Sequence, residues 1–266
     1  MRLAINVLSG DLELASAMCR AEGIGAEITA LAFPETLDSP DFDLRVADHG
    51  ATLEGVEPLS SNGPFLDLYV TSRDPRILTV CRDRHEKALK ASIDLSATIY
   101  VAHLGLVPLI RNRGYLADFA SRAAEFWVPF AETAWKHGTT IVLENLWEPT
   151  PDFQRQVVQE AGHPGLQASF DNGHALMFSD VPAREWVDVL GECLAHCYLH
   201  DNDGQYDQHL PVGQGIEDWP ILLDALDVIE SDPLIVLESD QFDQNVTSLE
   251  SIRRLLTGAA SRQTRH

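Results

Sequence analysis

Short apolar runs alternate along this chain with longer amphipathic segments. The runs are rich in Val, Ile and Leu and are bounded by Gly, Pro, Asn or Asp, as in IVLEN at 141–145. Apolar runs of this length are typical of strands buried on both faces of a parallel sheet. The longer segments repeat apolar residues at steps of three and four, which predicts helices that pack against such a sheet.

Eight strands are predicted, and each is followed by a helix. The strands lie in RLAINVL (2–8), in GAEITALAF (25–33), within 56–70, in ATIYVAHLG (97–105), and at 141–143, 166–171, 195–200 and 234–238. The helices lie at 10–25, within 35–54, at 74–96, at 114–137 with a break or kink near Pro129, and at about 151–161, 182–193, 218–230 and 245–257. Asp74 with Pro75 after it predicts a capped start for the third of these helices.

This alternation predicts a single α/β domain, a (β/α)8 TIM barrel with a parallel eight-stranded barrel and outer helices. No shift of composition marks a linker, so the barrel is expected to span residues 1–258, with a flexible C-terminal tail at 259–266. A doubly wound open sheet is the alternative. That fold more often carries a GxGxxG fingerprint after its first strand, and NVLSGDLEL lacks it.

The amino-acid composition limits the kinds of partner that the protein is expected to bind. The chain has 41 acidic and 19 basic residues and a formal charge of −22, so nucleic acid is disfavoured as a partner. The acidity also fits simple solubility, so it is not by itself evidence for a metal. No long apolar run lacks interruption, so no membrane partner is expected, and residues 1–8 are too short for a signal peptide, which favours a cytoplasmic location. Four cysteines without a CxxC pair are expected to be buried thiols.

Five polar residues stand at the ends of predicted strands four to eight: His103, Glu144, Asp171, His200 and Glu238. In a barrel the carboxyl ends of all strands meet around one cavity, so these side chains are expected to converge. A buried ionised carboxylate is costly without a cation opposite it. Carboxylates and an imidazole together predict one divalent ion, of Mn, Zn, Co or Mg.

A second set of polar residues lies close by in the sequence. His174 follows Asp171 in DNGH, and Asp207 and His209 lie in the loop after His200. They either belong to turns and the surface, or they bind substrate hydroxyls, orient the ligand histidine or hold further metal ions.

Other residues near these segments have two interpretations each. Trp147 and Phe178 form apolar walls of a site or pack in loops, and Glu148 is expected to be solvated rather than bonded to a substrate hydroxyl. VGQG before the helix near Trp219 is either a phosphate seat or a helix cap with the tryptophan packed beneath it.

The segments VAHLG, IVLENL, FDNGH, YLHDNDGQYDQHLPVGQGIEDW and LIVLES resemble the xylose-isomerase-like TIM-barrel superfamily. That superfamily contains sugar isomerases and epimerases and the endonuclease IV class of abasic-site endonucleases. The resemblance implies that Glu144, Asp171, His200 and Glu238 bind the metal and that the two glutamates are also the acid/base pair. It further implies that His174 contacts substrate or a metal, and that His103, Asp207 and His209 match additional ligands of the endonucleases' trinuclear zinc site.

Two departures from the superfamily stand out. Asn62 occupies a position where the endonucleases carry a histidine, and an amide is a poor transition-metal ligand. Tyr206 stands six residues after His200, where the epimerases carry an arginine.

These features predict a metal-dependent isomerase or epimerase of a small polyhydroxy carbonyl compound, with Glu144 and Glu238 moving a proton through an enediolate. A multinuclear zinc phosphoester hydrolase is the first alternative, and a non-catalytic metal-binding barrel is the second. A homo-oligomer is expected only by analogy with the superfamily.

Overall fold

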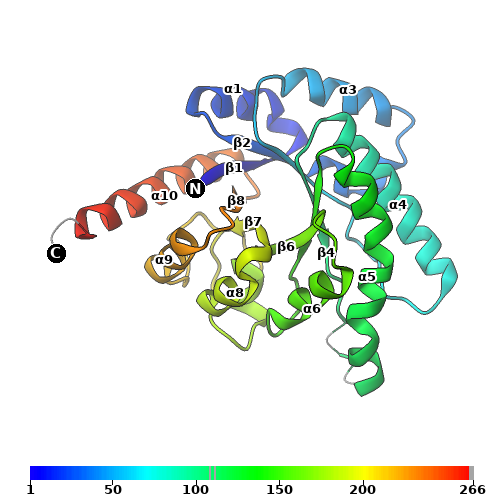
Figure 1. The fold of residues 1–266 in the computed structure, drawn as a ribbon. Helices are drawn as coiled ribbons and strands as arrows, with labels where there is room; N and C mark the ends of the chain where they lie inside the picture. The colour runs from blue at the N-terminus through cyan, green and yellow to red at the C-terminus, as the bar shows by residue number, and fades with distance from the viewer. Residues whose placement is uncertain (108, 111, 264–266) are drawn as a thin grey trace.

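A computed structural model describes residues 1–107, 109–110 and 112–263 of the chain (Figure 1). Eight parallel strands pair in sequence order, and β8 pairs with β1 to close the barrel, so the predicted (β/α)8 fold is confirmed. The strands are β1 Arg2–Val7, β2 Gly25–Ile28, β3 Leu59–Asn62, β4 Ile99–His103, β5 Thr140–Glu144, β6 Leu166–Asp171, β7 Leu194–Leu199 and β8 Leu234–Leu237.

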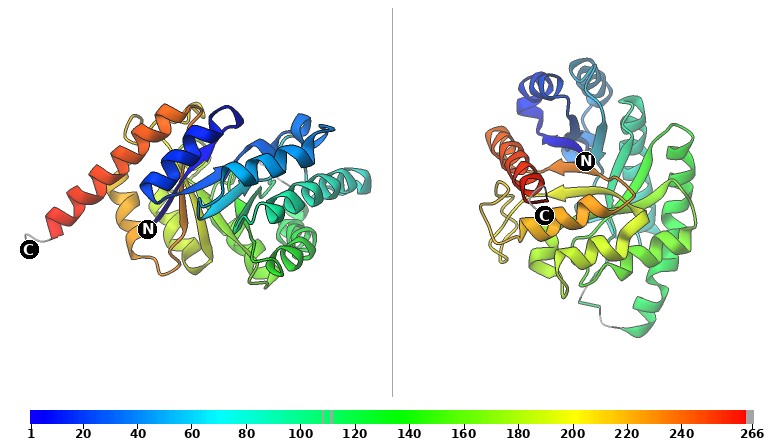
Figure 2. Two further views of the ribbon diagram at one scale, coloured as in Figure 1. Left: turned by 90° about the horizontal axis from the view of Figure 1, so that it is seen from above. Right: turned by 60° about the vertical axis from the view of Figure 1, so that its left-hand side comes forward.

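Helices surround the barrel on its outside (Figures 1 and 2). They are α1 Leu12–Glu22, α2 Pro34–Leu37, α3 Phe42–Thr52, α4 Pro75–Asp94, α5 Arg113–Trp135, α6 Asp152–Ala161, α7 Asn172–Phe178, α8 Ala183–Leu190, α9 Trp219–Val228 and α10 Phe242–Gln263, with short 3-10 turns at Ser9–Asp11, Ala30–Ala32 and Gly191–Cys193. None of the helices in the described residues is long and apolar enough to cross a membrane.

Several predicted boundaries differ from the structure. The second strand ends at Ile28 instead of residue 33, because the chain turns into a 3-10 helix there. Helix α5 runs unbroken through Pro129, so a break there is wrong, while the kink stays a prediction. The Phe126 and Phe130 rings stack on each other on the two sides of the proline and hold the helix there. Helix α10 continues to Gln263, so residues 259–263 of the expected tail are helical, while 264–266 lie outside the described residues.

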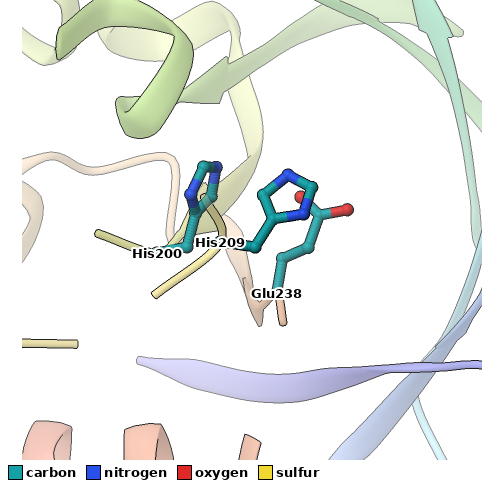
Figure 3. Close-up of side chains that lie close together, drawn as sticks. All are labelled: His200, His209 and Glu238. Carbon is teal, nitrogen blue, oxygen red and sulfur yellow. The ribbon is translucent and has the colours of Figure 1, made fainter. Parts of the chain in front are cut away.

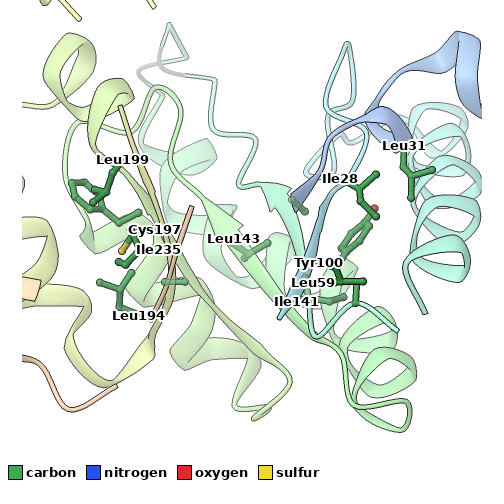
Figure 4. Close-up of a cluster of buried hydrophobic side chains, with 14 of the residues drawn as sticks. Ile28, Leu31, Leu59, Tyr100, Ile141, Leu143, Leu194, Cys197, Leu199 and Ile235 are labelled. Atoms are coloured by element: carbon green, nitrogen blue, oxygen red, sulfur yellow. The ribbon is translucent and has the colours of Figure 1, made fainter. Parts of the chain in front are cut away.

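Strand periodicity sorts the core into two layers. Side chains on the outer face of the strands, including Ile28, Leu59, Ile141 and Leu199, pack against the helices (Figure 4). A separate cluster fills the inside of the barrel and consists of Ala4, Ile99, Val101, Val142, Tyr198, Leu234 and Val236. Because side chains alternate along a strand, a residue two positions beyond an interior residue also faces inward. This rule aims the polar residues at the strand ends into the mouth of the barrel.

The cysteines and the helix cap match expectation. Cys19, Cys81 and Cys197 are buried and Cys193 is partly buried, all four as free thiols. Asp74 accepts a hydrogen bond of 2.8 Å from the backbone N–H of Arg76 and so caps helix α4, with Pro75 as its first residue.

Candidate metal centre and active site

The strand ends deliver the predicted polar residues to one mouth of the barrel. His103 ends β4, Glu144 ends β5 and Asp171 ends β6. His200 and Glu238 directly follow β7 and β8. Three of the five are almost completely buried, with 2% of Glu144 exposed and none of Asp171 or His200.

One group of possible ligands gathers around the end of β5. Donor atoms of Glu144, Asp171 and His174 lie within 4.8 Å of one another. His174 Nδ1 is 3.2 Å from Glu144 Oε1 and 3.4 Å from Asp171 Oδ2. His103 Nε2 approaches the same Glu144 oxygen at 3.4 Å from the neighbouring strand.

A second group contains His200, His209 and Glu238, whose donor atoms also lie within 4.8 Å of one another (Figure 3). His200 joins the two groups, because its Nε2 lies 3.1 Å and 3.3 Å from the two oxygens of Asp171. The four residues that the resemblance assigns to one ion are therefore divided two and two between the groups, and each group gains one further histidine.

Asp207 forms another connection between the groups. Its Oδ2 lies 3.3 Å from His174 Nε2 and 3.4 Å from His209 Nε2. His209 Nδ1 in turn lies 2.9 Å from Asp240 Oδ1. The structure thus brings His103, His174, Asp207 and His209 against the strand-end residues, with His174 buried, His103 and His209 partly buried and Asp207 exposed.

The motif DNGH, residues 171–174, fixes the positions of Asp171 and His174 beside His200 through local contacts. The Asp171 side chain caps α7 by accepting a hydrogen bond of 2.7 Å from the backbone N–H of His174. Gly173 lies against the His200 ring, and a Cβ atom at position 173 would be only 1.9 Å from His200 Cε1. Helix α7 was not predicted, because seven residues are too few to establish a helical period.

Burial and neighbouring charges shift the pKa values of Glu144 and Glu238 in opposite directions. Burial alone would raise the pKa of Glu144, but the charge of His103 and hydrogen bonds from His103 and His174 hold this pKa well below its usual range. Burial, reinforced by the charges of Asp171 and Glu144, raises the pKa of Glu238 to about 8 despite the opposing histidines His209 and His200. In the metal-free protein Glu144 is therefore ionised near neutral pH, and Glu238 is largely protonated.

The donor set fits a divalent cation. Glu144 Oε2, His103 Nδ1 and His200 Nδ1 are buried, and none of them has a hydrogen-bond partner among the described residues. An unpaired buried polar atom costs about 1–3 kcal/mol, and a bound cation removes this cost for an oxygen or an imidazole nitrogen that coordinates it. Carboxylate oxygens together with imidazole nitrogens are ligands that suit zinc, cobalt or manganese.

A cavity of about 290 Å³ opens beside His103. Its walls include Phe65, Leu106 and Trp147, and the Phe65 ring lies 5.1 Å from the His103 ring between centroids. Glu148 also lines this cavity and is only 2% exposed, so the expectation that it is solvated is wrong. No lysine or arginine is among the described residues that line the cavity.

The backbone explains why Glu148 is buried. Its carboxylate accepts N–H hydrogen bonds from Leu146 at 2.7 Å and from Leu106 at 3.3 Å. Burial nevertheless raises the pKa of Glu148 above its ordinary value.

Other predicted positions have more ordinary surroundings. Trp219 is 4% exposed and Asp218 caps helix α9, which agrees with the helix-cap interpretation of VGQG. Asn62 is buried inside the barrel, where its Nδ2 donates a hydrogen bond of 3.3 Å to the hydroxyl of Tyr198. Tyr206 and Phe178 are both exposed.

Sequence reasoning missed a polar pair inside the barrel. Glu27 and His196 are fully buried, and Glu27 Oε2 lies 3.3 Å from His196 Nε2. Ser60 donates a hydrogen bond of 2.8 Å to the same Glu27 oxygen. The signal was present in HCYLH, because His196, Tyr198 and His200 follow one another at a spacing of two on the inward face of β7.

Comparisons with known proteins place the chain in a family. The sequence profile described as "Xylose isomerase-like TIM barrel" matches residues 16–257. The uncharacterized protein MJ1311 of Methanocaldococcus jannaschii is 26% identical over 203 residues, which cover 73% of this chain and 69% of that protein.

Two solved structures resemble this one over nearly their whole length. The TTHB071 protein from Thermus thermophilus, soaked with ZnCl2, is 26% identical with a TM-score of 0.78, over 96% of this chain and 98% of that chain. A D-tagatose 3-epimerase-like protein is 23% identical with a TM-score of 0.79, over 98% and 99% of the two chains, and this second likeness shows the fold alone. Since the family profile spans most of its length, the chain belongs to the xylose isomerase-like TIM-barrel family.

Proposed function

We propose that this protein is a divalent-metal-dependent isomerase or epimerase that acts on a sugar or a related polyhydroxy carbonyl compound. The observation that carries the proposal is the pair of glutamates at one mouth of the barrel, Glu144 at the end of β5 and Glu238 just after β8, beside the buried Asp171 and His200. Two carboxylates in one site can act as base and acid in a proton transfer. The fold of the D-tagatose 3-epimerase-like protein supports the same reaction class.

Metal binding in this proposal uses Glu144, Asp171, His200 and Glu238. When bound by these residues, a divalent ion would polarise a substrate carbonyl and stabilise the negative charge on its oxygen. His103 and His174 hold the Glu144 carboxylate in place through contacts of 3.4 and 3.2 Å.

The glutamates carry the proton. Glu144 takes the proton from the carbon next to the carbonyl, and the electron pair of that C–H bond forms the enediolate. Glu238 then returns a proton to the opposite face of the same carbon, which inverts its configuration. Return of the proton to the neighbouring carbon moves the carbonyl instead, with the hydroxyl proton of the enediolate passing from one substrate oxygen to the other. Exchange with solvent resets both side chains.

The neighbouring cavity supports an uncharged substrate. Phe65, Leu106 and Trp147 supply apolar walls, and the buried Glu148 carboxylate would accept a hydroxyl hydrogen but repel a phosphate. The lack of lysine and arginine in the described lining points the same way.

Deuterium exchange tests the proposal. The protein loaded with Mn²⁺, Co²⁺ or Zn²⁺ is incubated with D-tagatose and D-fructose in heavy water, and incorporation at carbon is followed by NMR. We expect exchange in the wild type and a fall of about 100-fold or more in Glu144→Gln and Glu238→Gln. Asp203→Asn is the control, because it neutralises an exposed carboxylate in the loop after β7 and keeps the metal ligands, and it is expected to retain exchange. Equal rates in the wild type and both glutamate variants would contradict the mechanism.

A phosphoester hydrolase is the second candidate, and one observation favours it. Asp207 bridges His174 and His209, which provides more ligands than a single ion requires. Two or three zinc ions per chain by elemental analysis, together with hydrolysis of bis(p-nitrophenyl) phosphate, would replace the first proposal with this one.

A further inference from the structure

The loop between β7 and α9 carries two of the site residues, Asp207 and His209, without regular secondary structure of its own. It spans residues 200–218 and contains one isolated β-bridge, between Asp201 and Leu210, and further backbone hydrogen bonds from Gln214 to Pro211 and from Ile216 to Asn202. Long loops of this kind in compact domains are usually functional. Something other than a helix or strand must therefore fix the two side chains.

Asp201 is the centre of this loop. It is completely buried, and each oxygen of its carboxylate accepts two N–H donors. Oδ1 accepts the backbone N–H groups of Asn202 and Glu217, both at 3.2 Å. Oδ2 accepts the backbone N–H of Gly213 at 3.0 Å and the indole N–H of Trp219 at 2.8 Å. The carboxylate thus ties the end of the loop, at Gly213, Glu217 and Trp219, to its beginning at Asp201.

The backbone of Asp201 fixes the outgoing half of the loop. Its N–H and C=O both bond to Leu210 at 2.8 Å, directly beside His209. His209 itself has a φ of 44°, a conformation that L residues rarely adopt without support from their surroundings. A Cβ atom at Gly215 would lie 2.3 Å from Asp201 Oδ1, so the loop wraps around the carboxylate too closely for a side chain there.

We propose that Asp201 is a positioning residue, which orders this loop in the metal-free protein so that His209 meets Glu238 and Asp207 meets His174. The ligand role of His209 and Asp207 rests on the proposed function. The ordering of the loop does not, because the hydrogen bonds of Asp201 described above need no metal or substrate.

Asp201→Asn is a sharp perturbation because it keeps the size of the side chain. The amide oxygen of the asparagine can accept the two N–H groups that bond one carboxylate oxygen in the wild type. Its NH₂ group then faces the other two N–H groups, and no hydrogen bond forms there because both sides are donors. Asp203→Asn is the matched control. Asp203 accepts backbone N–H bonds in the same loop, from Gln205 at 2.9 Å and Tyr206 at 3.2 Å, but it is exposed and contacts neither ligand group.

Two measurements test the proposal. Hydrogen–deuterium exchange of the metal-free protein is expected to be at least tenfold faster for residues 202–217 in Asp201→Asn, with β5 and β6 unchanged and with Asp203→Asn like the wild type at residues 209–217. Titration with Co²⁺ is expected to show binding about 10–100-fold weaker in Asp201→Asn. Its visible spectrum should then match that of His209→Ala instead of the wild type.

The outcomes separate this proposal from the function. Unchanged exchange in the loop of Asp201→Asn overturns the positioning role, and so does a loosened loop with wild-type Co²⁺ affinity and spectrum. If the wild type binds no Co²⁺, the proposed metal-dependent function fails, and the exchange experiment alone then decides the role of Asp201. Should Asp201→Asn not fold, Trp219→Phe removes a single donor to Oδ2 and is expected to show the same changes at a smaller size. Wild-type behaviour of that variant also overturns the proposal.

Discussion

A single methyl group at position 173 should weaken metal binding strongly while leaving the fold intact. In Gly173→Ala the new Cβ would lie 1.9 Å from His200 Cε1, whereas ordinary contact begins at 3.4 Å, so the ring must move by at least 1.5 Å. The ring has little freedom, because Asp171 contacts its Nε2 at 3.1 Å and the His209 ring stacks edge-on against it at 4.6 Å. Metal–ligand distances tolerate only about 0.2 Å. The displaced imidazole therefore leaves the coordination sphere.

The effect on stability should be small by comparison. Overpacking costs about 1–3 kcal/mol, and alanine in helix α7 recovers up to about 1 kcal/mol of helix propensity. We expect the free energy of unfolding of the metal-free variant, measured in urea, to fall by about 2 kcal/mol at most. Its affinity for Zn²⁺ or Co²⁺ should fall by about 100-fold or more, because the variant displaces a ligand, whereas loss of a residue that only supports a ligand costs about 10–100-fold.

Calorimetric titration with Zn²⁺ and urea unfolding of the same samples separate the two effects. Gly50→Ala serves as the control, since it also replaces a helical glycine but meets only Leu95 Cδ2 at 3.4 Å. It should keep its metal and gain slightly in stability. Wild-type metal affinity in Gly173→Ala would refute the assignment of His200 as a ligand.

Three further predictions follow from the same geometry. Burial lowers the pKa of His209, but the hydrogen bond to Asp207 and the nearby carboxylates outweigh burial and raise this pKa from 6.5 to about 10. Because the folded protein binds the His209 proton more tightly than the unfolded chain, the protonated imidazole stabilises the fold fully below pH 6.5 and progressively less as the pH rises toward 10. The metal-free wild type should therefore be less stable in urea at pH 9 than at pH 6, and His209→Gln should reduce this difference; a pH-independent wild type contradicts the assignment. Zn²⁺ at a concentration of 100 times its Kd should raise the free energy of unfolding of the wild type by about 2.7 kcal/mol, and a chelator should reverse this gain. An unchanged unfolding midpoint would mean that Zn²⁺ does not bind the folded protein in preference to the unfolded chain. Trp147→Ala, at a side chain 37% exposed, should change the free energy of unfolding by less than about 1 kcal/mol but raise the KM for a ketose substrate with little change in kcat; an unchanged KM would remove Trp147 from the substrate pocket.

Local periodicity was enough to predict most of the fold. The strand ending at Asp171 and the helix capped by Asp74 were predicted within one residue at those ends, because apolar runs and capping residues act over a few positions. The break at Pro129 was wrong because aromatic packing along the helix overrode a local penalty. Helix α7 was missed because one side-chain cap, from Asp171, starts a helix too short to show a period.

By itself the sequence determined which residues reach the mouth of the barrel. Alternation along a parallel strand, together with a strand end at a known residue, is sufficient to aim Glu144 or His103 inward. Only the tertiary structure decided how these side chains group, because distances between strands depend on barrel closure and on loops that no local rule describes. It divided the strand-end residues into two ligand groups, buried Glu148 on backbone N–H groups from two loops, and made Asp201 the centre of a loop whose contacts span 18 residues of sequence.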